Sequence, residues 1–263
     1  MKITKNINLL LRLILIPCCL LFITYLIIKA SVWLSGIADN GNTPSPPLTS
    51  FGIAMPAGYT VFGIDVSKHQ GNIDWKRVSR MSSNSIKLEF AFIKATEGIT
   101  RQDAKFETNW EQSAQNGLLR GAYHFYYPSR DPIKQAENFI KAVELGKGDL
   151  PPVVDIEMSN GKTAAKICAD LEVFITKLEK HYAVKPIIYT NINFYTRYLK
   201  GHFDEYPLWI ACYFDHDRFY NEFSAPWILW QHSQNGKVDG IEGYVDINVF
   251  NGSVEILRKR TIQ

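Results

Sequence analysis

Two carboxylates, Asp155 and Glu157, lie at the end of the short apolar segment Leu150–Glu157. Side chains in a strand alternate between its two faces, so Asp155 and Glu157 are expected to point to one side and Ile156 to the other. A charged side chain beside an apolar core must be paired with another charge, hydrated or retained for a function such as catalysis. Two carboxyls with different pKa values supply an acid and a base, which glycoside hydrolysis requires. The structural alternative is an acid that caps the next helix or pairs with a lysine, and this short pattern alone does not decide between the two.

The elements that must position this pair alternate between strand-like and helix-like segments. Apolar runs bounded by turn residues predict eight strands, at 61–66, 89–95, 119–125, 152–157, 185–190, 207–212, 227–231 and 244–247. Helical patterns predict helices at 74–81, 104–116, 132–145, 163–182 and, more weakly, 192–199. This alternation predicts an α/β fold, a TIM-like parallel (β/α)8 barrel with a reduced set of helices. An open doubly wound sheet is the alternative.

A barrel would bring acids from different strands to one cleft, because barrel enzymes keep their chemistry at the carboxyl ends of the strands. Period-two alternation allows Asp65 and Asp246 to point inward together with Asp155 and Glu157. The last strand closes against the first, so Asp246 and Asp65 are expected to be neighbours. Four inward acids at strand ends are difficult to explain by structure alone, and they predict a catalytic cleft.

Aromatic and amide side chains near the same strand ends are candidates for contact with a sugar. For any one of these aromatic residues, packing in the core is the more common role. The candidate substrate-binding residues are Tyr123, Phe125, Tyr189, Trp209, Tyr213 and Gln231.

The N-terminal region has the composition of a membrane anchor followed by a linker. Leu13–Ile28 carries no charged residue, and apolar flanks extend it toward the roughly 20 residues that a membrane span needs. Basic residues precede this run, so the N-terminus is expected in the cytoplasm and the remainder outside the cytoplasmic membrane, on the periplasmic or cell-wall side. A cleaved signal peptide is the alternative. We predict a cytoplasmic stub and single-pass transmembrane anchor at 1–38, a Pro/Gly/Ser-rich linker at 39–58 and a catalytic domain at 59–263.

Charge and cysteine content argue against several classes of protein. The formal net charge of +3 arises before residue 51, and the remainder is balanced, so no basic field indicates nucleic-acid binding. His69, His124 and His232 do not have metal-ligand spacing, and we expect neither a metal nor another cofactor. Cys168 and Cys212 are expected to be buried thiols rather than a disulfide.

Ordered motifs over residues 59–252 resemble glycoside hydrolase family 25, the Chalaropsis-type lysozymes or N-acetylmuramidases. The motifs are Gly63-Ile-Asp-Val-Ser-Lys-His-Gln-Gly71, Phe92-Ile-Lys-Ala-Thr-Glu-Gly98, Gly121-Ala-Tyr-His-Phe-Tyr126, Val154-Asp-Ile-Glu157, Ile188-Tyr-Thr190, Leu208-Trp-Ile-Ala211, Trp230-Gln231 and Val245-Asp-Ile-Asn-Val-Phe250. The resemblance implies an eight-stranded barrel with fewer than eight helices. It also implies hydrolysis of the β-1,4 bond between N-acetylmuramic acid and N-acetylglucosamine in peptidoglycan, here by a membrane-anchored bacterial member.

The resemblance also implies roles for the four acids. Glu157 maps to the catalytic acid, and Asp155, Asp65 and Asp246 map to supporting acids. We expect a raised pKa for Glu157 beside an ionised Asp155, because the departing sugar needs a proton donor. Three mechanisms remain open: attack by the sugar's own 2-acetamido oxygen, a direct protein nucleophile, or an inverting water, with Asp246 or Asp65 serving the last two.

Two other functions fit the same sequence. One is a non-catalytic glycan-binding module, and the other is a glycosidase that acts on a different substrate. The leading hypothesis remains a muramidase whose partners are peptidoglycan glycan strands and, through its anchor, the membrane. We expect it to be a monomer.

Overall fold

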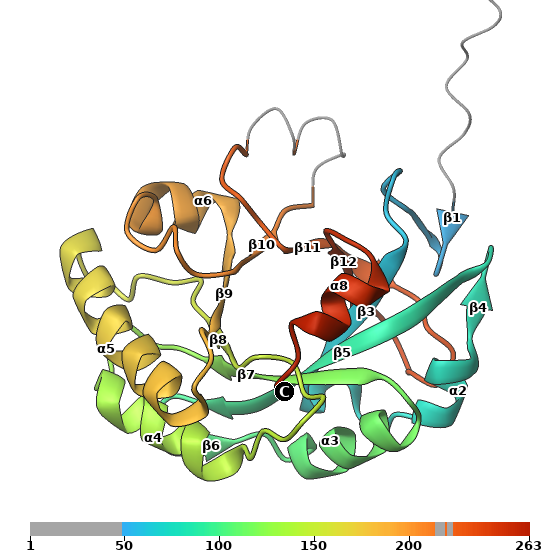
Figure 1. Cartoon of the computed structure of the whole chain (residues 1–263), viewed down its shortest axis with the longest axis horizontal. Helices are drawn as coiled ribbons and strands as arrows, with labels where there is room; N and C mark the ends of the chain where they lie inside the picture. The colour runs from blue at the N-terminus through green and yellow to red at the C-terminus, as the bar shows by residue number, and fades with distance from the viewer. Residues whose placement is uncertain (1–48, 214–218, 220–222) are drawn as a thin grey trace, which may run out of the picture. The chain divides into compact units, whose positions relative to one another are not determined.

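Eight strands close into a barrel in this computed structural model, which describes residues 49–213, 219 and 223–263 (Figure 1). The strands are β3 (Val61–Val66), β5 (Ile86–Glu97), β7 (Leu119–Phe125), β8 (Val153–Asp155), β9 (Ile187–Asn191), β10 (Leu208–Ala211), β11 (Leu229–Gly236) and β12 (Val245–Phe250). They follow one another around the barrel in sequence order, and β3 pairs with both β5 and β12 to close it. An open sheet is therefore excluded.

The last strand corrects the expectation of a wholly parallel barrel. β12 runs antiparallel to both of its neighbours, β11 and β3, so the barrel is mixed. A parallel connection needs a crossover of about a dozen residues or more, and the segment 237–244 is too short for one. Because β12 runs backwards, Asp246 near its start lies at the same rim as the carboxyl ends of the parallel strands. Asp246 pairs in register with Asp65, as expected for neighbours.

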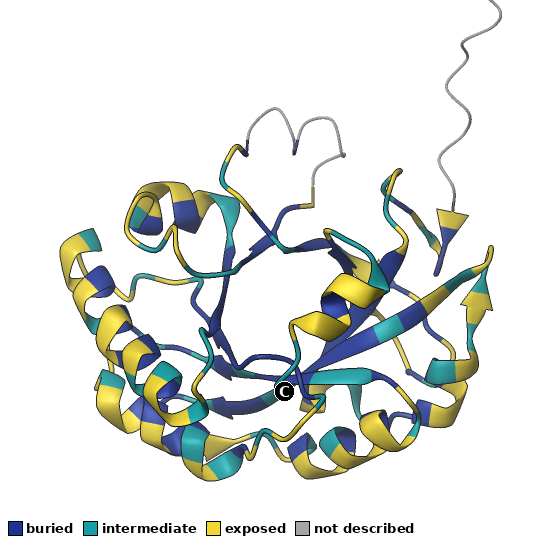
Figure 2. Ribbon diagram, in the orientation of Figure 1, coloured by how far each residue is buried: buried dark blue, intermediate teal, exposed yellow. Residues whose placement is uncertain are grey.

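The helices have exposed outer faces and buried faces toward the strands (Figure 2). They are α2 (Trp75–Arg80), α3 (Phe106–Gln115), α4 (Pro132–Ala142), α5 (Ala164–Tyr182), α6 (Ile192–Phe194) and α8 (Val254–Lys259), with a 3-10 turn η1 (Lys68–Gln70) and a π-helical turn η2 (Tyr195–Leu199). Short strands add to the periphery: β1 (Thr49–Ser50), β2 (Ile53–Ala54), β4 (Ser82–Ser83) and β6 (Arg101–Gln102).

Local sequence signals explain where the two longest helices begin. Asp131 caps α4 by accepting from the Lys134 backbone N–H at 3.0 Å, and Pro132 occupies the first helical turn. Thr163 caps α5 in the same way. The apolar stripe of α5 is buried against the barrel through Ile167, Cys168, Leu171, Phe174, Ile175 and Leu178.

The amino end of the barrel is filled with apolar side chains. Phe90 and Phe92 lie over glycines of neighbouring strands: a Cβ on Gly63 would come within 2.4 Å of the Phe90 ring, and one on Gly121 within 2.3 Å of the Phe92 ring. Leu257 of α8 belongs to the same buried cluster, so the C-terminal helix covers this end. The interior at the opposite, carboxyl end carries acids and other polar side chains together with aromatic rings.

The segment before the barrel is partly folded. Phe51, between β1 and β2, is buried, and its carbonyl accepts from the Lys237 backbone N–H at 2.7 Å. The linker predicted for 39–58 therefore overlaps the folded unit, which here includes residues 49–58. The predicted anchor lies outside the described residues. Among the helices that the structure does describe, none is long and apolar enough to cross a membrane.

Candidate active site

A cleft of about 460 Å³ opens at the carboxyl end of the barrel strands. Its lining contains all four acids expected at the site: Asp65, Asp155, Glu157 and Asp246. It also contains each candidate substrate-binding residue: Tyr123, Phe125, Tyr189, Trp209, Tyr213 and Gln231. The strand alternation read from the sequence thus placed nine of these ten residues together, and Tyr213 follows the end of its predicted strand; the chemical roles of all ten remain predictions.

Asp65 is held by two amides. Gln231 Nε2 donates to Asp65 Oδ2 at 2.8 Å, and Asn248 Nδ2 donates to the same oxygen at 2.7 Å. The three side chains come from β11, β12 and β3, and all three are buried. Two N–H donors on one oxygen favour the ionised form of that carboxyl.

Aromatic donors fix the orientation of these amides. Tyr189 and Tyr213 hydroxyls both donate to Gln231 Oε1, at 2.9 and 2.6 Å. The Trp209 indole N–H donates to Asn248 Oδ1 at 2.9 Å. Because both amide oxygens are occupied by donors, both amide nitrogens must face Asp65. Tyr189, Trp209 and Tyr213 therefore shape the acid network as well as the cleft wall.

Asp155 and Glu157 lie on the far side of the barrel from this network in strand order. β8 ends at Asp155, and Glu157 follows the strand rather than belonging to it. The hydrogen bonding between β8 and β9 continues one residue beyond the end of β8, since the Ile156 N–H donates to the Tyr189 carbonyl at 3.0 Å. Asp155 is 7% exposed, and its Oδ1 is buried with no hydrogen-bond partner in the described part of the chain.

Burial changes the acidity of both members of this pair. It raises the pKa of Asp155 well above the usual range, and the charge of Glu157 raises it further. Burial also raises the pKa of Glu157, as does the charge of Asp65, while hydrogen bonds from Asn191 and Asp155 lower it. The two carboxyls together therefore hold a proton more tightly than ordinary carboxyls do. The expected rise in the pKa of Glu157 is present, but the expected ionised Asp155 is contradicted for the enzyme without substrate, because burial and the charge of Glu157 both favour the protonated form of Asp155.

The second acid pair behaves similarly. Burial raises the pKa of Asp246 to about 8, and the charge of Asp65 contributes in the same direction. Burial also raises the pKa of Asp65, although hydrogen bonds from Asn248, Gln231 and Asp246 oppose this. Asp246 is thus the member that carries a proton, and it donates to Asp65.

Three residues that serve the site were not identified from the sequence. Lys94 lines the cleft and forms an ion pair with Glu97 at 2.8 Å. Asn191 hydrogen-bonds Glu157, and Asn248 holds Asp65. Period two identifies Lys94 from Phe92 and Asn248 from Asp246, so the signal was present. Asn191, at the end of β9, follows in the same way from Tyr189.

Histidine and cysteine positions agree with structural roles away from the cleft, with one exception. His124 is fully buried, and its Nδ1 lies 2.7 Å from Thr96 Oγ1. Cys168 and Cys212 are both buried, as expected. His69 instead lines the cleft rim. Among residues 49–213, 219 and 223–263, no three His, Cys, Asp or Glu side chains are arranged to hold a metal ion.

Comparisons with known proteins agree with this geometry. The model of the family "Glycosyl hydrolases family 25" matches residues 64–241. The chain is 48% identical over 212 residues to the protein YegX of Escherichia coli K12, which covers 81% of this chain and 77% of that protein. It is 32% identical over 236 residues to Lysozyme M1 of Streptomyces globisporus, covering 82% of this chain and 75% of that one.

Solved structures show the same fold. A family 25 glycosyl hydrolase from Bacillus anthracis superposes with a TM-score of 0.70 at 32% identity, covering 84% of this chain and 100% of that chain. A lysozyme from Streptomyces coelicolor gives a TM-score of 0.66 at 30% identity, covering 78% and 98%. On the family match and these relatives, the chain belongs to glycosyl hydrolases family 25 and is a glycosidase of the lysozyme type.

Proposed function

We propose that this enzyme hydrolyses the β-1,4 bond between N-acetylmuramic acid and N-acetylglucosamine in peptidoglycan. The observation that carries the proposal is the cleft in which four buried or half-buried carboxyls meet aromatic and amide side chains. Such a lining suits a neutral, hydroxyl-rich sugar chain and supplies proton donors for a glycosidic bond. A named lysozyme among the relatives supports the same substrate.

Glu157 is the proposed general acid. It lies just after β8, is less buried than Asp155 and has a pKa raised by burial, so it holds a proton more readily than an ordinary glutamate while remaining accessible to substrate. Proton transfer to the glycosidic oxygen would leave Glu157 ionised. Its hydrogen bond from Asn191 stabilises that charge.

Asp155 is the proposed partner of the substrate's 2-acetamido group. Its buried Oδ1 has no partner within the described chain, and an amide N–H is the donor that such an oxygen lacks. This contact would stabilise an ionised Asp155, so the shared proton would move to Glu157 when substrate binds. The oriented acetamido oxygen would then attack the anomeric carbon. Asp65 and Asp246 are less suited to that attack, because their oxygens are engaged with each other and with two amides.

Product analysis tests the bond and the acid together. The purified full chain, its Glu157→Gln variant and the surface control Glu111→Gln on α3 would each be incubated with purified peptidoglycan. Reduced products would be identified by mass spectrometry. Muramic-acid reducing ends from the parent and the control, absent from Glu157→Gln, are expected. Glucosamine reducing ends would assign a different bond. Binding without products from any of the three proteins would leave a glycan-binding module and contradict the proposal.

We also propose that residues 13–28 anchor a monomeric enzyme in the cytoplasmic membrane, with the barrel outside. The support is the uncharged run and the basic residues before it. Membrane fractionation of the producing cells tests the anchor. The protein should remain with membranes after a high-salt, alkaline wash. Recovery as a shortened soluble form would favour a cleaved signal peptide instead. Size-exclusion chromatography with light scattering tests the monomer.

A further inference from the structure

A second hollow, of about 520 Å³, lies at the carboxyl ends of β5 and β7. We call it the arginine hollow; it is lined by Glu97, Ile99, Arg101, Tyr127, Arg130 and Asn160, among others. Its walls are the tight β5–β6 hairpin, in which Glu97 pairs with Arg101, and the turn that leads into α4. None of the residues assigned to the reaction belongs to it.

The arginine hollow and the catalytic cleft are separated by one layer of side chains. Lys94 lines the cleft, and its ammonium contacts Glu97 of the hollow at 2.8 Å. Phe125 lines the cleft, and its ring centroid lies 5.3 Å from that of Tyr127 in the hollow. The Tyr127 hydroxyl donates to Glu97 Oε1 at 2.7 Å, which completes the partition. A branch of a substrate bound in the cleft needs to cross only this partition to reach the hollow.

Two buried amides of α4 hold the walls of the hollow in place. Asn138 Nδ2 donates to the carbonyls of Gly98 and Arg101, at 2.9 and 3.1 Å. Gln135 Oε1 accepts from the Tyr127 N–H at 2.8 Å, and its Nε2 donates to the Tyr127 carbonyl at 3.0 Å. Both amides are buried and hydrogen-bond to the backbone of the walls. Because the wall is already ordered, binding of a ligand costs less conformational entropy than it would at a flexible wall.

The hollow has the opposite charge to the cleft. Arg101 and Arg130 are both exposed, and Glu97 is the one acid in its lining. Glu97 is already satisfied by Lys94, Arg101 and Tyr127. Arg101 uses one of its nitrogens in that contact, and Arg130 has no acidic partner within 4.0 Å in the part of the chain that the structure describes. Guanidinium groups with free donors are suited to bidentate contact with a carboxylate.

We propose that the arginine hollow binds a carboxylate of the peptide branch carried by muramic acid, so that the preferred substrate is peptide-bearing glycan. This inference rests on the proposed function. The sugar rings of the glycan are uncharged, and its carboxylates belong to peptides attached at the lactyl group of the muramic acid whose bond is cut. The acid-lined cleft repels such a carboxylate, and the adjoining arginines attract it.

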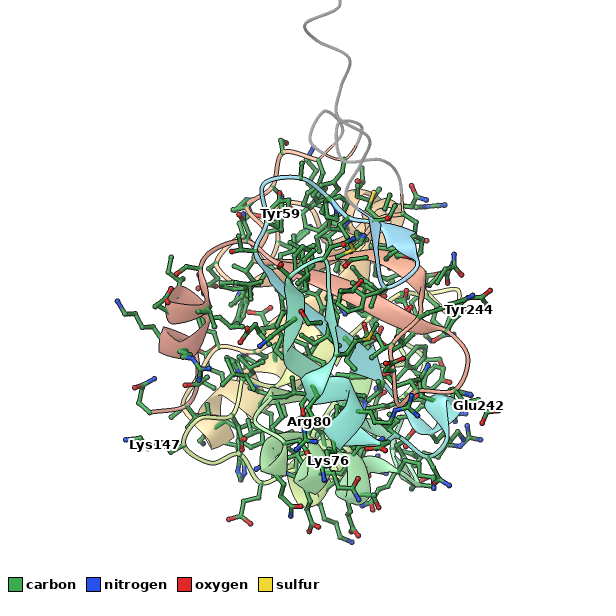
Figure 3. All side chains as sticks on the ribbon, turned by 90° about the vertical axis from the view of Figure 1, so that its right-hand side faces the viewer. Tyr59, Lys76, Arg80, Lys147, Glu242 and Tyr244 are labelled. Atoms are coloured by element: carbon green, nitrogen blue, oxygen red, sulfur yellow. The ribbon has the colours of Figure 1, made fainter. Side chains whose placement is uncertain are left out.

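The test compares two forms of the same glycan. Full-length parent, Arg130→Gln, Arg101→Gln and the double variant would be assayed on peptide-bearing peptidoglycan fragments and on the same fragments after their peptide carboxylates have been converted to neutral amides. Arg80→Gln is the matched control, because Arg80 is an exposed arginine of α2 outside the hollow (Figure 3). Arg130→Lys keeps the positive charge but loses the paired N–H donors of the guanidinium group.

For the double variant, kcat/KM on peptide-bearing substrate should fall by roughly ten- to hundredfold, mainly through KM, which is the usual range for lost charged hydrogen bonds. Activity on the fragments with amidated carboxylates should change less than about twofold, as should both activities of Arg80→Gln. Arg130→Lys should recover part of the loss. Equal losses on the two substrates, or no loss on either, would overturn the proposal. A parent inactive on both substrates would instead refute the proposed function itself.

Discussion

At the scale of single residues, the site depends on side chains that orient other side chains. Asn248 and Gln231 donate to one oxygen of Asp65 and so favour its ionised form against the effect of burial, and these amides are held by Trp209, Tyr189 and Tyr213. An ionised Asp65 raises the pKa of both Asp246 and Glu157. The aromatic lining of the cleft is therefore linked to the protonation of the proposed acid through two amides and one carboxylate.

Asn248→Ala should separate this positioning role from simple packing. Loss of one N–H donor destabilises the Asp65 anion and raises its pKa, so the acid limb of the pH–activity profile should move to higher pH. At the optimum, kcat should fall by roughly ten- to hundredfold with little change in KM, as for a lost hydrogen bond to a charged group. Steady-state kinetics over a pH range measure both effects.

The matched control is Asn116→Ala, at the exposed end of α3. It should leave kcat and the profile unchanged. If Asn248→Ala lowers kcat without moving the acid limb, Asn248 has only a structural role.

The residues of the cleft could be predicted from strand alternation, whereas their partners could not. Each predicted acid and aromatic side chain lies on a strand or just beyond its end, where period two gives its direction. The choice of Asn248 and Gln231 as donors to Asp65 depends on register between β3, β11 and β12. Such register is set by the whole barrel, and a single strand does not reveal it.

At the scale of elements, packing inside the barrel depends on phenylalanines that lie opposite glycines on neighbouring strands. Phe92 lies directly opposite Gly121 in the β5–β7 register, and Phe90 opposite Gly63 in the β3–β5 register. The aromatic rings occupy the space that a Cβ would need. Gly63 and Gly121, which belong to the motifs read from the sequence, are thus required by packing in the barrel interior.

Gly121→Ala should destabilise the fold without altering the chemistry of the cleft. The added Cβ would lie 2.3 Å from the Phe92 ring, so the ring or the strand must shift. Overpacking of this kind costs about 1–3 kcal/mol. Urea denaturation followed by tryptophan fluorescence measures the free energy of unfolding.

The control for this change is Gly146→Ala, where the nearest atom to a new Cβ is Asp149 Oδ2 at 3.8 Å. Its free energy of unfolding should stay within about 0.5 kcal/mol of the parent, as for most surface changes. A Gly121→Ala protein as stable as the control would show that the strands yield easily at this point.

Most elements could be predicted from the sequence, and the exceptions have physical reasons. β3 and β7 have the predicted bounds, whereas β8 ends at Asp155, two residues before the predicted end. The direction of β12 was predicted wrongly because composition does not report direction, although the short segment 237–244 excludes a helical crossover. The hairpin of β1 and β2 was read as linker, since its apolar residues are few and its burial depends on contacts with the distant β11–β12 loop.

At the scale of the whole molecule, the two ends of the barrel interior have opposite effects on the free energy of unfolding. The amino end buries aromatic and aliphatic side chains beneath α8, which stabilises the fold. The carboxyl end holds four acids whose pKa values are raised, mainly by burial, and which are therefore costly to ionise in the folded state. Stability is thus lower than it would be with a neutral cleft, as is usual where function requires buried charge.

This opposition predicts that the free energy of unfolding falls as the pH rises from about 6.5 to 8. The pKa of Asp246 is raised from 3.8 to about 8, so the folded enzyme holds a proton that the unfolded chain has lost. One such group costs up to about 1.4 kcal/mol of stability per pH unit. Burial lowers the pKa of His124 from 6.5 to about 3, so His124 reduces stability only as the pH falls below 6.5. Above that pH, the effect of the carboxyls is unopposed by this histidine.

Asp246→Asn should therefore flatten the decline between pH 6.5 and pH 8 while abolishing most activity. The amide removes one titrating group and one charge that repels Asp65, so two sources of the pH dependence weaken together. Urea denaturation at the two pH values gives the comparison, with Glu111→Gln as the surface control that should follow the parent. A variant whose stability declines as steeply as the parent's would show that Asp246 already ionises below pH 6.5. The proton assigned to the Asp65–Asp246 pair would then be absent at neutral pH, and Asp65 would face a second full charge that only its two amides could offset.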